Sequence, residues 1–257
     1  VRSGFSGGIS PRGTSARPTS SRRTLVVGDV HGCRAELEAL LAHARFVPGT
    51  DRLVLVGDLV AKGPDSLGAV RLALRVGAEA VRGNHDARCL GWWHATRDGA
   101  PPPALGRSHR AACEALGPEE WAYLDAQPVL RRYDDVLAQR TLLVVHGGLD
   151  PLVDPDELAT ENPDLVMNAR SLDAEGQLST KALGRPWGAA WAGPELVVYG
   201  HDALRGLQQH PHALGLDTGC VYGGALTGAL FTDDPEPELL RVAAERVYCQ
   251  PKGPPGG

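Results

Sequence analysis

The sequence predicts an α/β fold, which some classification schemes place with α+β, because short apolar runs alternate with helical patterns. Each run is rich in aliphatic and β-branched residues, has the length of a buried strand, and ends in a turn that carries polar residues. The predicted strands are Thr24–Val27, Arg52–Val56, Glu79–Val81, Thr141–Val145 and Glu195–Tyr199. Leucine and valine recur at helical spacing in Arg34–Arg45 and Ser66–Val76, which we predict to be helices between the first three strands.

The remaining segments are less regular. Residues 87–132 are rich in helix formers and contain Pro101-Pro102-Pro103, so we expect two or three helices there, forming a helical cap at the edge of a site. Residues 162–194 are expected to form a long ordered loop with short elements. We predict a single domain over residues 24–249 between two disordered tails, 1–23 and 250–257. The acid-free composition of residues 1–23 leaves an organellar transit segment as an alternative.

The overall composition narrows the possible partners. The chain has 257 residues, of which 42% are apolar, and a formal net charge of -5. This acidic balance argues against a nucleic-acid-binding face, but a metal centre would supply its own positive charge for a small anionic phosphate substrate. The five cysteines are scattered without a C-x-x-C pair. No apolar run reaches the roughly 20 residues of a membrane span. We therefore expect a reduced, cytoplasmic protein without a membrane partner.

Residues of metal-binding type follow all of the predicted strands. They are Asp29, His31, Asp58, Asn84, His146 and His201. Sites in α/β sheets form at the carboxyl ends of strands, so we expect these side chains to converge. Carboxylate, imidazole and amide ligands suit a pair of divalent metals that hydrolyses a phosphate ester or anhydride. Glycines beside them would let the backbone turn sharply close to the metals.

Individual positions indicate individual roles. Asp29 and His31 are two residues apart and can point the same way from the end of one strand. Asp58 could bridge two metals through its single carboxylate. His85 and Asp86 directly follow Asn84 in the third polar turn. A histidine that is oriented by a carboxylate suits protonation of a leaving oxygen.

The polar turns, as they stand, resemble motifs of the phosphoprotein phosphatase superfamily of metallophosphoesterases. The motifs are Gly28-Asp29-Val30-His31-Gly32, Gly57-Asp58-Leu59-Val60-Ala61-Lys62-Gly63, Gly83-Asn84-His85-Asp86, His146-Gly147-Gly148 and Gly200-His201. The resemblance implies a calcineurin-like fold, which is a central β-sandwich flanked by helices. It also implies two divalent metal ions, most often manganese, with zinc, iron, cobalt or nickel as chemically acceptable alternatives.

The resemblance further implies a role for each residue. One metal would be held by Asp29, His31 and Asp58, and the other by Asp58, Asn84, His146 and His201. His85, paired with Asp86, would be the general acid. Within the superfamily the chain is similar to the ApaH-like branch, related to symmetrical diadenosine tetraphosphatase, through residues 57–66, 167–170 and 215–224.

Two positions depart from the eukaryotic Ser/Thr phosphatases of this superfamily, which usually have Arg in place of Lys62 and Glu in place of Asp86. Lys62 could still contact a phosphate oxygen, but as a point charge without the bidentate fork of arginine. Arg170 is the better candidate for a bidentate grip on the phosphoryl group. We predict that Lys62 and Arg170 bind substrate, with an ordinary surface position as the alternative for each.

The leading functional interpretation is a phosphatase acting on phosphoanhydrides such as diadenosine tetraphosphate, on phosphomonoesters, or on both, by in-line attack of a metal-activated hydroxide. The ApaH-like branch also includes enzymes that act on polyphosphate, RNA caps and phosphoproteins, so polyphosphatase and Ser/Thr or Tyr phosphoprotein phosphatase activities stay open. A decayed, metal-binding module is the non-enzymatic alternative, although every ligand position is filled. Trp187 and Trp191 could stack on a nucleobase or pack in the core, and their spacing favours packing.

Overall fold

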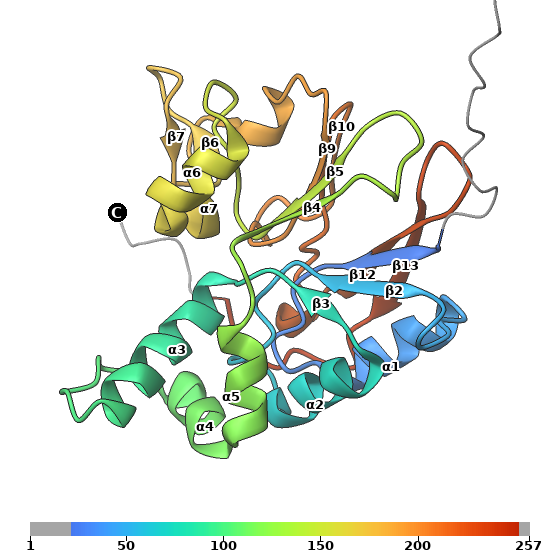
Figure 1. The fold of residues 1–257 in the computed structure, drawn as a ribbon. Helices are drawn as coiled ribbons and strands as arrows, with labels where there is room; N and C mark the ends of the chain where they lie inside the picture. Colours follow the sequence, from blue (N-terminus) through green and yellow to red (C-terminus); the bar gives the residue numbers. More distant parts are fainter. Residues whose placement is uncertain (1–21, 252–257) are drawn as a thin grey trace, which may run out of the picture.

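Two five-stranded sheets form the centre of the structure, a computed structural model that describes residues 22–251 (Figure 1). The first sheet has the order β13 (Glu238–Ala243), β12 (Ala225–Phe231), β1 (Thr24–Val27), β2 (Arg52–Leu55), β3 (Glu79–Ala80). The second has the order β10 (Gln208–His210), β11 (Ala213–Gly215), β9 (Leu196–Tyr199), β5 (Leu142–Val145), β4 (Leu130–Tyr133). A small third sheet has the order β7 (Leu178–Ser179), β6 (Ser171–Leu172), β8 (Arg185–Pro186).

The strands that lead into the polar turns are parallel to one another within each sheet. β1 pairs with β2, placing Leu25 opposite Leu53, and β2 pairs with β3. In the second sheet β5 pairs in parallel with β9, placing Val144 opposite Val198. β12 and β4 are antiparallel to their neighbours β1 and β5. The carboxyl ends of the parallel strands therefore share one edge of each sheet, where functional side chains collect in α/β folds.

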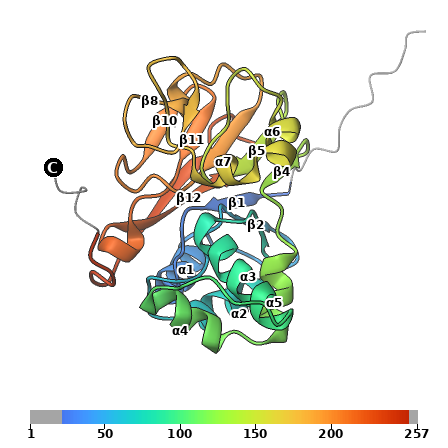
Figure 2. The same cartoon turned by 90° about the vertical axis from the view of Figure 1, so that its left-hand side faces the viewer.

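Helices cover the outer faces of the two sheets (Figure 2). On the side of the first sheet are α1 (Arg34–His43), α2 (Ser66–Val76), α3 (Asn84–Arg97), α4 (Arg107–Ala115) and α5 (Pro118–Asp125). Beside the second sheet are α6 (Pro155–Glu161), α7 (Pro163–Asn168) and the 3-10 helix η1 (Trp187–Ala189), while a second 3-10 turn, η2 (Cys220–Tyr222), precedes β12. Within residues 22–251, no helix combines the length and the apolar character of a membrane span.

Local signals in the sequence determine where α2 begins and ends. The side chain of Asp65 accepts a hydrogen bond from the N–H of Gly68 at 2.7 Å, which caps the first turn of the helix. Gly77 ends the helix with φ at 68°, a left-handed conformation that glycine adopts without strain. α2 therefore has the bounds that its apolar spacing predicts, and it returns the chain to the start of β3.

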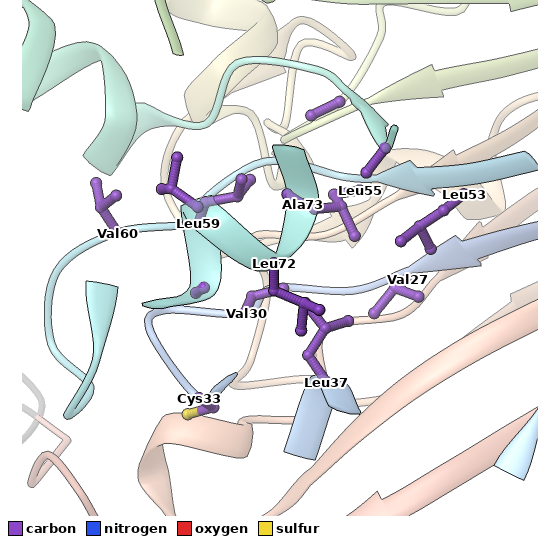
Figure 3. Packing of buried hydrophobic residues seen from close by; sticks show 14 of the residues in the cluster. Val27, Val30, Cys33, Leu37, Leu53, Leu55, Leu59, Val60, Leu72 and Ala73 are labelled. Carbon is purple, nitrogen blue, oxygen red and sulfur yellow. The ribbon is translucent and has the colours of Figure 1, made fainter. Parts of the chain in front are cut away.

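Apolar side chains alternate along the strands and divide the core into layers. Val26 and Val54 lie between the two sheets, whereas Leu53 and Leu55 point to the opposite face, where α1 and α2 cover them (Figure 3). Because both faces are buried, these strands read as continuous apolar runs rather than as an alternating pattern. A third cluster, on the outer face of the second sheet, contains Trp187, which is only 1% exposed.

The observed architecture confirms the predicted fold class, a β-sandwich flanked by helices. The five predicted strands and both predicted helices are present, with ends that shift by at most two residues. Residues 87–132 include most of α3 and all of α4 and α5. Most of the two predicted tails, 1–23 and 250–257, lies outside the described residues, namely residues 1–21 and 252–257.

The buried position of Leu53 predicts a large effect on stability. Leu53 is 1% exposed within the cluster that joins the first sheet to its helices. We expect Leu53→Ala to lower the free energy of unfolding by about 2–5 kcal/mol, because it removes buried apolar atoms and leaves a cavity. Urea denaturation measures this change. The matched control Leu183→Ala, at a side chain that is 74% exposed, should have little effect. A loss no larger than the control's would contradict the packing.

Candidate metal centre

The six residues predicted as metal ligands lie together where the carboxyl edges of the two sheets meet. Asp29 and His31 follow β1, Asp58 follows β2, Asn84 begins α3, His146 follows β5 and His201 follows β9. The backbone N–H of His201 donates to Oδ1 of Asp29 at 3.0 Å. Nε2 of His146 lies 3.4 Å from Oδ2 of Asp58 and 3.1 Å from Oδ1 of Asn84. Side chains from both sheets therefore meet in one place.

Asp58 lies at the centre of this group. Its Oδ2 is 3.3 Å from Nε2 of His31 and 3.4 Å from Nε2 of His146, and the residue is 1% exposed. Its Oδ1 accepts a hydrogen bond from the backbone N–H of His85 at 2.8 Å. Asp58 also belongs to two overlapping clusters of metal-type side chains, one with Asp29 and His146 and one with His31 and His85. This geometry suits a carboxylate that two cations share.

Backbone carbonyl groups determine how the imidazoles face Asp58. Nδ1 of His31 lies 3.1 Å from the carbonyl oxygen of Val60, and Nδ1 of His146 lies 2.8 Å from that of Val56. A carbonyl oxygen only accepts hydrogen bonds, so Nδ1 of each ring carries a proton and Nε2 is the nitrogen left to bind a metal ion. Hydrogen bonds of this kind usually orient histidines that bind metals.

Three of the candidate ligands have unusual backbone conformations. His31, Asp58 and His201 have φ values of 45°, 51° and 69°, in the left-handed region that residues other than glycine rarely adopt. Gly57 precedes Asp58 with φ at 96°, and a Cβ atom there would lie 2.6 Å from the backbone N of Gly83. Such strain gathers at functional sites, where the surrounding structure holds it in place.

Buried negative charge dominates the electrostatics of the site. Burial raises the pKa of Asp29, and the neighbouring carboxylate of Asp217 raises it further. Burial also acts to raise the pKa of Asp58, but His146, His85 and His31 outweigh it and hold that pKa well below its usual range. Burial lowers the pKa of His146, yet Asp58 and Asp29 overcome this and raise it to about 9. Several buried acceptor groups thus face one point, an arrangement that fits divalent cations.

Lys62, predicted to bind substrate, lies inside the site. Its Nζ is 2.9 Å from Nε2 of His31 and 5.3 Å from the centre of the Tyr222 ring. Burial acts to lower the pKa of Lys62, but Asp58 and Tyr222 outweigh this effect and raise it, so the amine stays charged. The structure therefore places a cation beside the candidate ligands, within the reach of an anionic substrate.

Arg170, the other predicted substrate-binding residue, contacts the turn that carries His201. Its Nη1 donates to the carbonyl oxygen of His201 at 3.0 Å and to Oδ1 of Asp202 at 3.1 Å. Asp202 also forms an ion pair with Arg205, so it holds two guanidinium groups at this edge of the site. The Arg170 side chain is 22% exposed. Its observed contacts position the turn, and its contact with phosphate stays a prediction.

The structure does not pair His85 with Asp86, contrary to the prediction from the sequence. Oδ1 of Asp86 accepts hydrogen bonds from the N–H groups of Leu59 at 3.0 Å and Val60 at 3.2 Å, and Oδ2 accepts one from Gly83 at 3.1 Å. The reason is local, because Asp86 is the third residue of α3 and its carboxylate turns back to cap the start of the helix.

Residues that sequence reasoning did not assign complete the site. Nδ1 of His85 faces Nε2 of His109 at 2.7 Å. His109 belongs to α4, in the segment that was predicted only as a helical cap. Asp217 is 6% exposed and acts on the pKa of Asp29. Asp217 and Tyr222 both fall in residues 215–224, a stretch that the sequence singled out without giving its members roles. Nothing in the spacing of His109 indicated its partner.

The fold and the site define a phosphoesterase. The chain belongs to the calcineurin-like phosphoesterase family, whose sequence profile matches residues 22–205. Enzymes of this class hydrolyse phosphate esters or anhydrides, and the family uses a dinuclear divalent metal centre.

Relatives with similar sequences span almost the whole chain. It is 31% identical to a symmetrical bis(5'-nucleosyl)-tetraphosphatase of Photorhabdus laumondii over 82% of this chain and 94% of the relative. It is 29% identical to the protein of that name from Pectobacterium atrosepticum, over 89% and 94% of the two chains. A solved structure described as a "putative diadenosine tetraphosphatase" is 38% identical, covers 89% of this chain and 96% of its own, and has a TM-score of 0.74.

The contacts of Asp86 predict that its loss destabilises the fold. Asp86→Asn should lower the free energy of unfolding by about 1–3 kcal/mol, because an amide cannot accept all the backbone hydrogen bonds of this buried carboxylate. Thermal and urea unfolding would measure the change, with Asp98→Asn, after the other end of α3, as the matched control. Unchanged stability together with reduced turnover would contradict this structural role. It would instead indicate that Asp86 acts on His85.

Proposed function

We propose that this protein hydrolyses phosphoanhydrides of the dinucleoside polyphosphate type, such as diadenosine tetraphosphate. The observation that carries the proposal is Asp58, whose carboxylate lies within 3.3 and 3.4 Å of imidazoles from two different sheets. Relatives that carry the name of this activity match the chain over most of both lengths, which supports the choice of substrate.

Two divalent cations would be held by overlapping sets of ligands. The first set is Asp29, His31 and Asp58, and the second is Asp58, Asn84, His146 and His201. Two observations support this assignment, namely the short distances around Asp58 and the hydrogen bonds at Nδ1 of His31 and His146, which leave Nε2 of each ring facing Asp58. Manganese is the proposed metal, although the same ligands would accept zinc, iron, cobalt or nickel. Such cations neutralise the charge of a phosphoryl group and make a bound water more acidic.

Other side chains would bind the substrate and assist the departure of the leaving group. Lys62 would contact a phosphate oxygen as a point charge, and Arg170 would do so from the segment between α7 and β6 while it positions the His201 turn. His85 is the proposed proton donor, because its Nε2 lies 4.0 Å from Oδ2 of Asp58 and its side chain is 20% exposed, whereas that of His146 is fully buried. His85 can therefore approach a leaving oxygen that the deeper imidazole cannot reach.

A panel of substrates tests the proposed activity. With excess manganese, kcat/KM should be highest for diadenosine tetraphosphate, compared with tripolyphosphate and with phosphoserine and phosphotyrosine peptides. Symmetrical hydrolysis should release ADP, which chromatography would detect. A preference for the peptides would identify a phosphoprotein phosphatase, and a preference for tripolyphosphate a polyphosphatase. The absence of turnover with all four would contradict the proposal.

Asp58→Asn tests the shared carboxylate. An amide carries no charge to neutralise two cations, so we expect reduced manganese content and a loss of turnover of about 10²-fold or more. Metal analysis and kcat would be measured together after circular dichroism confirms folding. The control is Asp234→Asn at an exposed position, which should retain both properties. Wild-type turnover in Asp58→Asn would refute the bridging role.

A further inference from the structure

We propose that His109 is a positioning residue for His85, and that it keeps a proton on Nε2 of His85 facing the reacting phosphoryl group. This inference rests on the proton-donor role of His85 under the proposed function. His109 belongs to α4, outside the strand-end turns that supply the candidate ligands, so helix α4 would take a direct part in arranging the site.

The contact between the two imidazoles is short and well defined. Nδ1 of His85 and Nε2 of His109 are 2.7 Å apart, and the two rings meet edge to edge, with their centres 4.8 Å apart and their planes inclined by 17°. His109 is 8% exposed, so little water can compete for this hydrogen bond. The neighbouring carboxylate of Asp86 is held by backbone N–H groups. His109 is therefore the hydrogen-bonding partner of Nδ1 of His85, while the ring of His31 packs edge-on against His85 at 5.0 Å.

A second contact holds the two helices in register. Cys89 on α3 and Cys113 on α4 are buried in the same cluster, and each follows its helix's histidine by four residues. Positions four residues apart lie on the same face of a helix, so the histidine pair and the cysteine pair form successive contacts between α3 and α4. The packing of α4 thus presents His109 to His85 in a fixed position.

An imidazole partner has a chemical property that a carboxylate partner lacks. When His85 is neutral, Nε2–H of His109 can donate to Nδ1 of His85, which leaves the single proton of His85 on Nε2. When His85 is charged, His109 can change its tautomer and accept from Nδ1–H instead. A carboxylate could only accept, and would hold the proton of a neutral ring on Nδ1. In both states His109 therefore keeps an N–H on Nε2.

The N–H on Nε2 of His85 lies beside the candidate metal site, where it can donate a hydrogen bond to a substrate. Nε2 of His85 lies 4.0 Å from Oδ2 of Asp58, at the carboxylate that both candidate metal sets share. A phosphate substrate offers only acceptor oxygens here, so a bare lone pair on Nε2 would oppose it, whereas an N–H would donate to the leaving oxygen. His109 thus acts on the reaction through His85 without contacting the substrate.

Variants of His109 separate this role from simple packing. His109→Phe keeps an aromatic ring without a nitrogen, His109→Gln offers an amide that can donate or accept, and Arg110→Ala changes an exposed side chain of the same helix as a matched control. On the best substrate of the panel we expect His109→Phe to lower kcat by about 10- to 100-fold, the size typical of losing a group that orients a functional histidine. KM should stay within about threefold of wild type in His109→Phe, His109→Gln should recover most of the loss, and Arg110→Ala should be close to wild type.

A double-mutant cycle decides whether the effect passes through His85. In a His85→Asn background, His109→Phe should cause less than about twofold further loss, because the interaction is already absent. A further loss as large as in the wild type would overturn the proposal, as would a wild-type kcat in His109→Phe. His109→Leu is a second variant, for the case in which His109→Phe does not fold. Whichever of the two retains the wild-type circular dichroism spectrum is used in the cycle.

A measurement independent of turnover completes the test. Nitrogen-15 NMR of the zinc-loaded protein reports which ring nitrogen of His85 carries the proton. We expect the proton on Nε2 in the wild type and a mixture of tautomers in the substituted protein. An identical tautomer state in both would contradict the role of His109. Because this readout needs no substrate, it can fail while the proposed activity stands, and the substrate panel can fail while it succeeds.

Discussion

The arrangement of the site depends on one buried carboxylate, Asp58, at the junction of the two sheets. Its Oδ2 faces imidazoles of His31 and His146, which come from different sheets, and its Oδ1 holds the first turn of α3 through the N–H of His85. The single side chain thus orders elements on both sides of the sandwich. The left-handed backbone at Asp58, with Gly57 before it, is the local conformation that makes this position possible.

This constraint explains why the site is strained and why its charges are unbalanced. Taking several carboxylates out of water is costly unless cations accompany them, and Lys62 and a charged His146 are fewer than the three carboxylates of Asp29, Asp58 and Asp217. A pair of divalent ions would satisfy these groups and the imidazole lone pairs at once. Stability and chemistry would then depend on the same ions, because the free energy of binding them would add to that of folding.

The sequence predicted the elements whose signals are local. The runs at Thr24–Val27 and Thr141–Val145 show β-branched strands buried on both faces, and the glycine-rich turns after them indicate where ligands belong. Contacts between distant segments were not predictable in the same way. His85 and Asp86 are adjacent in sequence, which suggested a pair, but the helical geometry of α3 turns Asp86 back towards Gly83. The partner of His85 instead comes from α4, 24 residues away, and only the packing of the helices shows it.

Two divalent ions that share Asp58 would connect the fold to the proposed activity. Anomalous diffraction from crystals of the manganese-loaded protein, collected at the manganese absorption edge, tests this most directly. We expect two peaks, one on each side of the Asp58 carboxylate, the first beside Asp29 and His31 and the second beside Asn84, His146 and His201. A single peak, or peaks that do not contact Asp58, would contradict it.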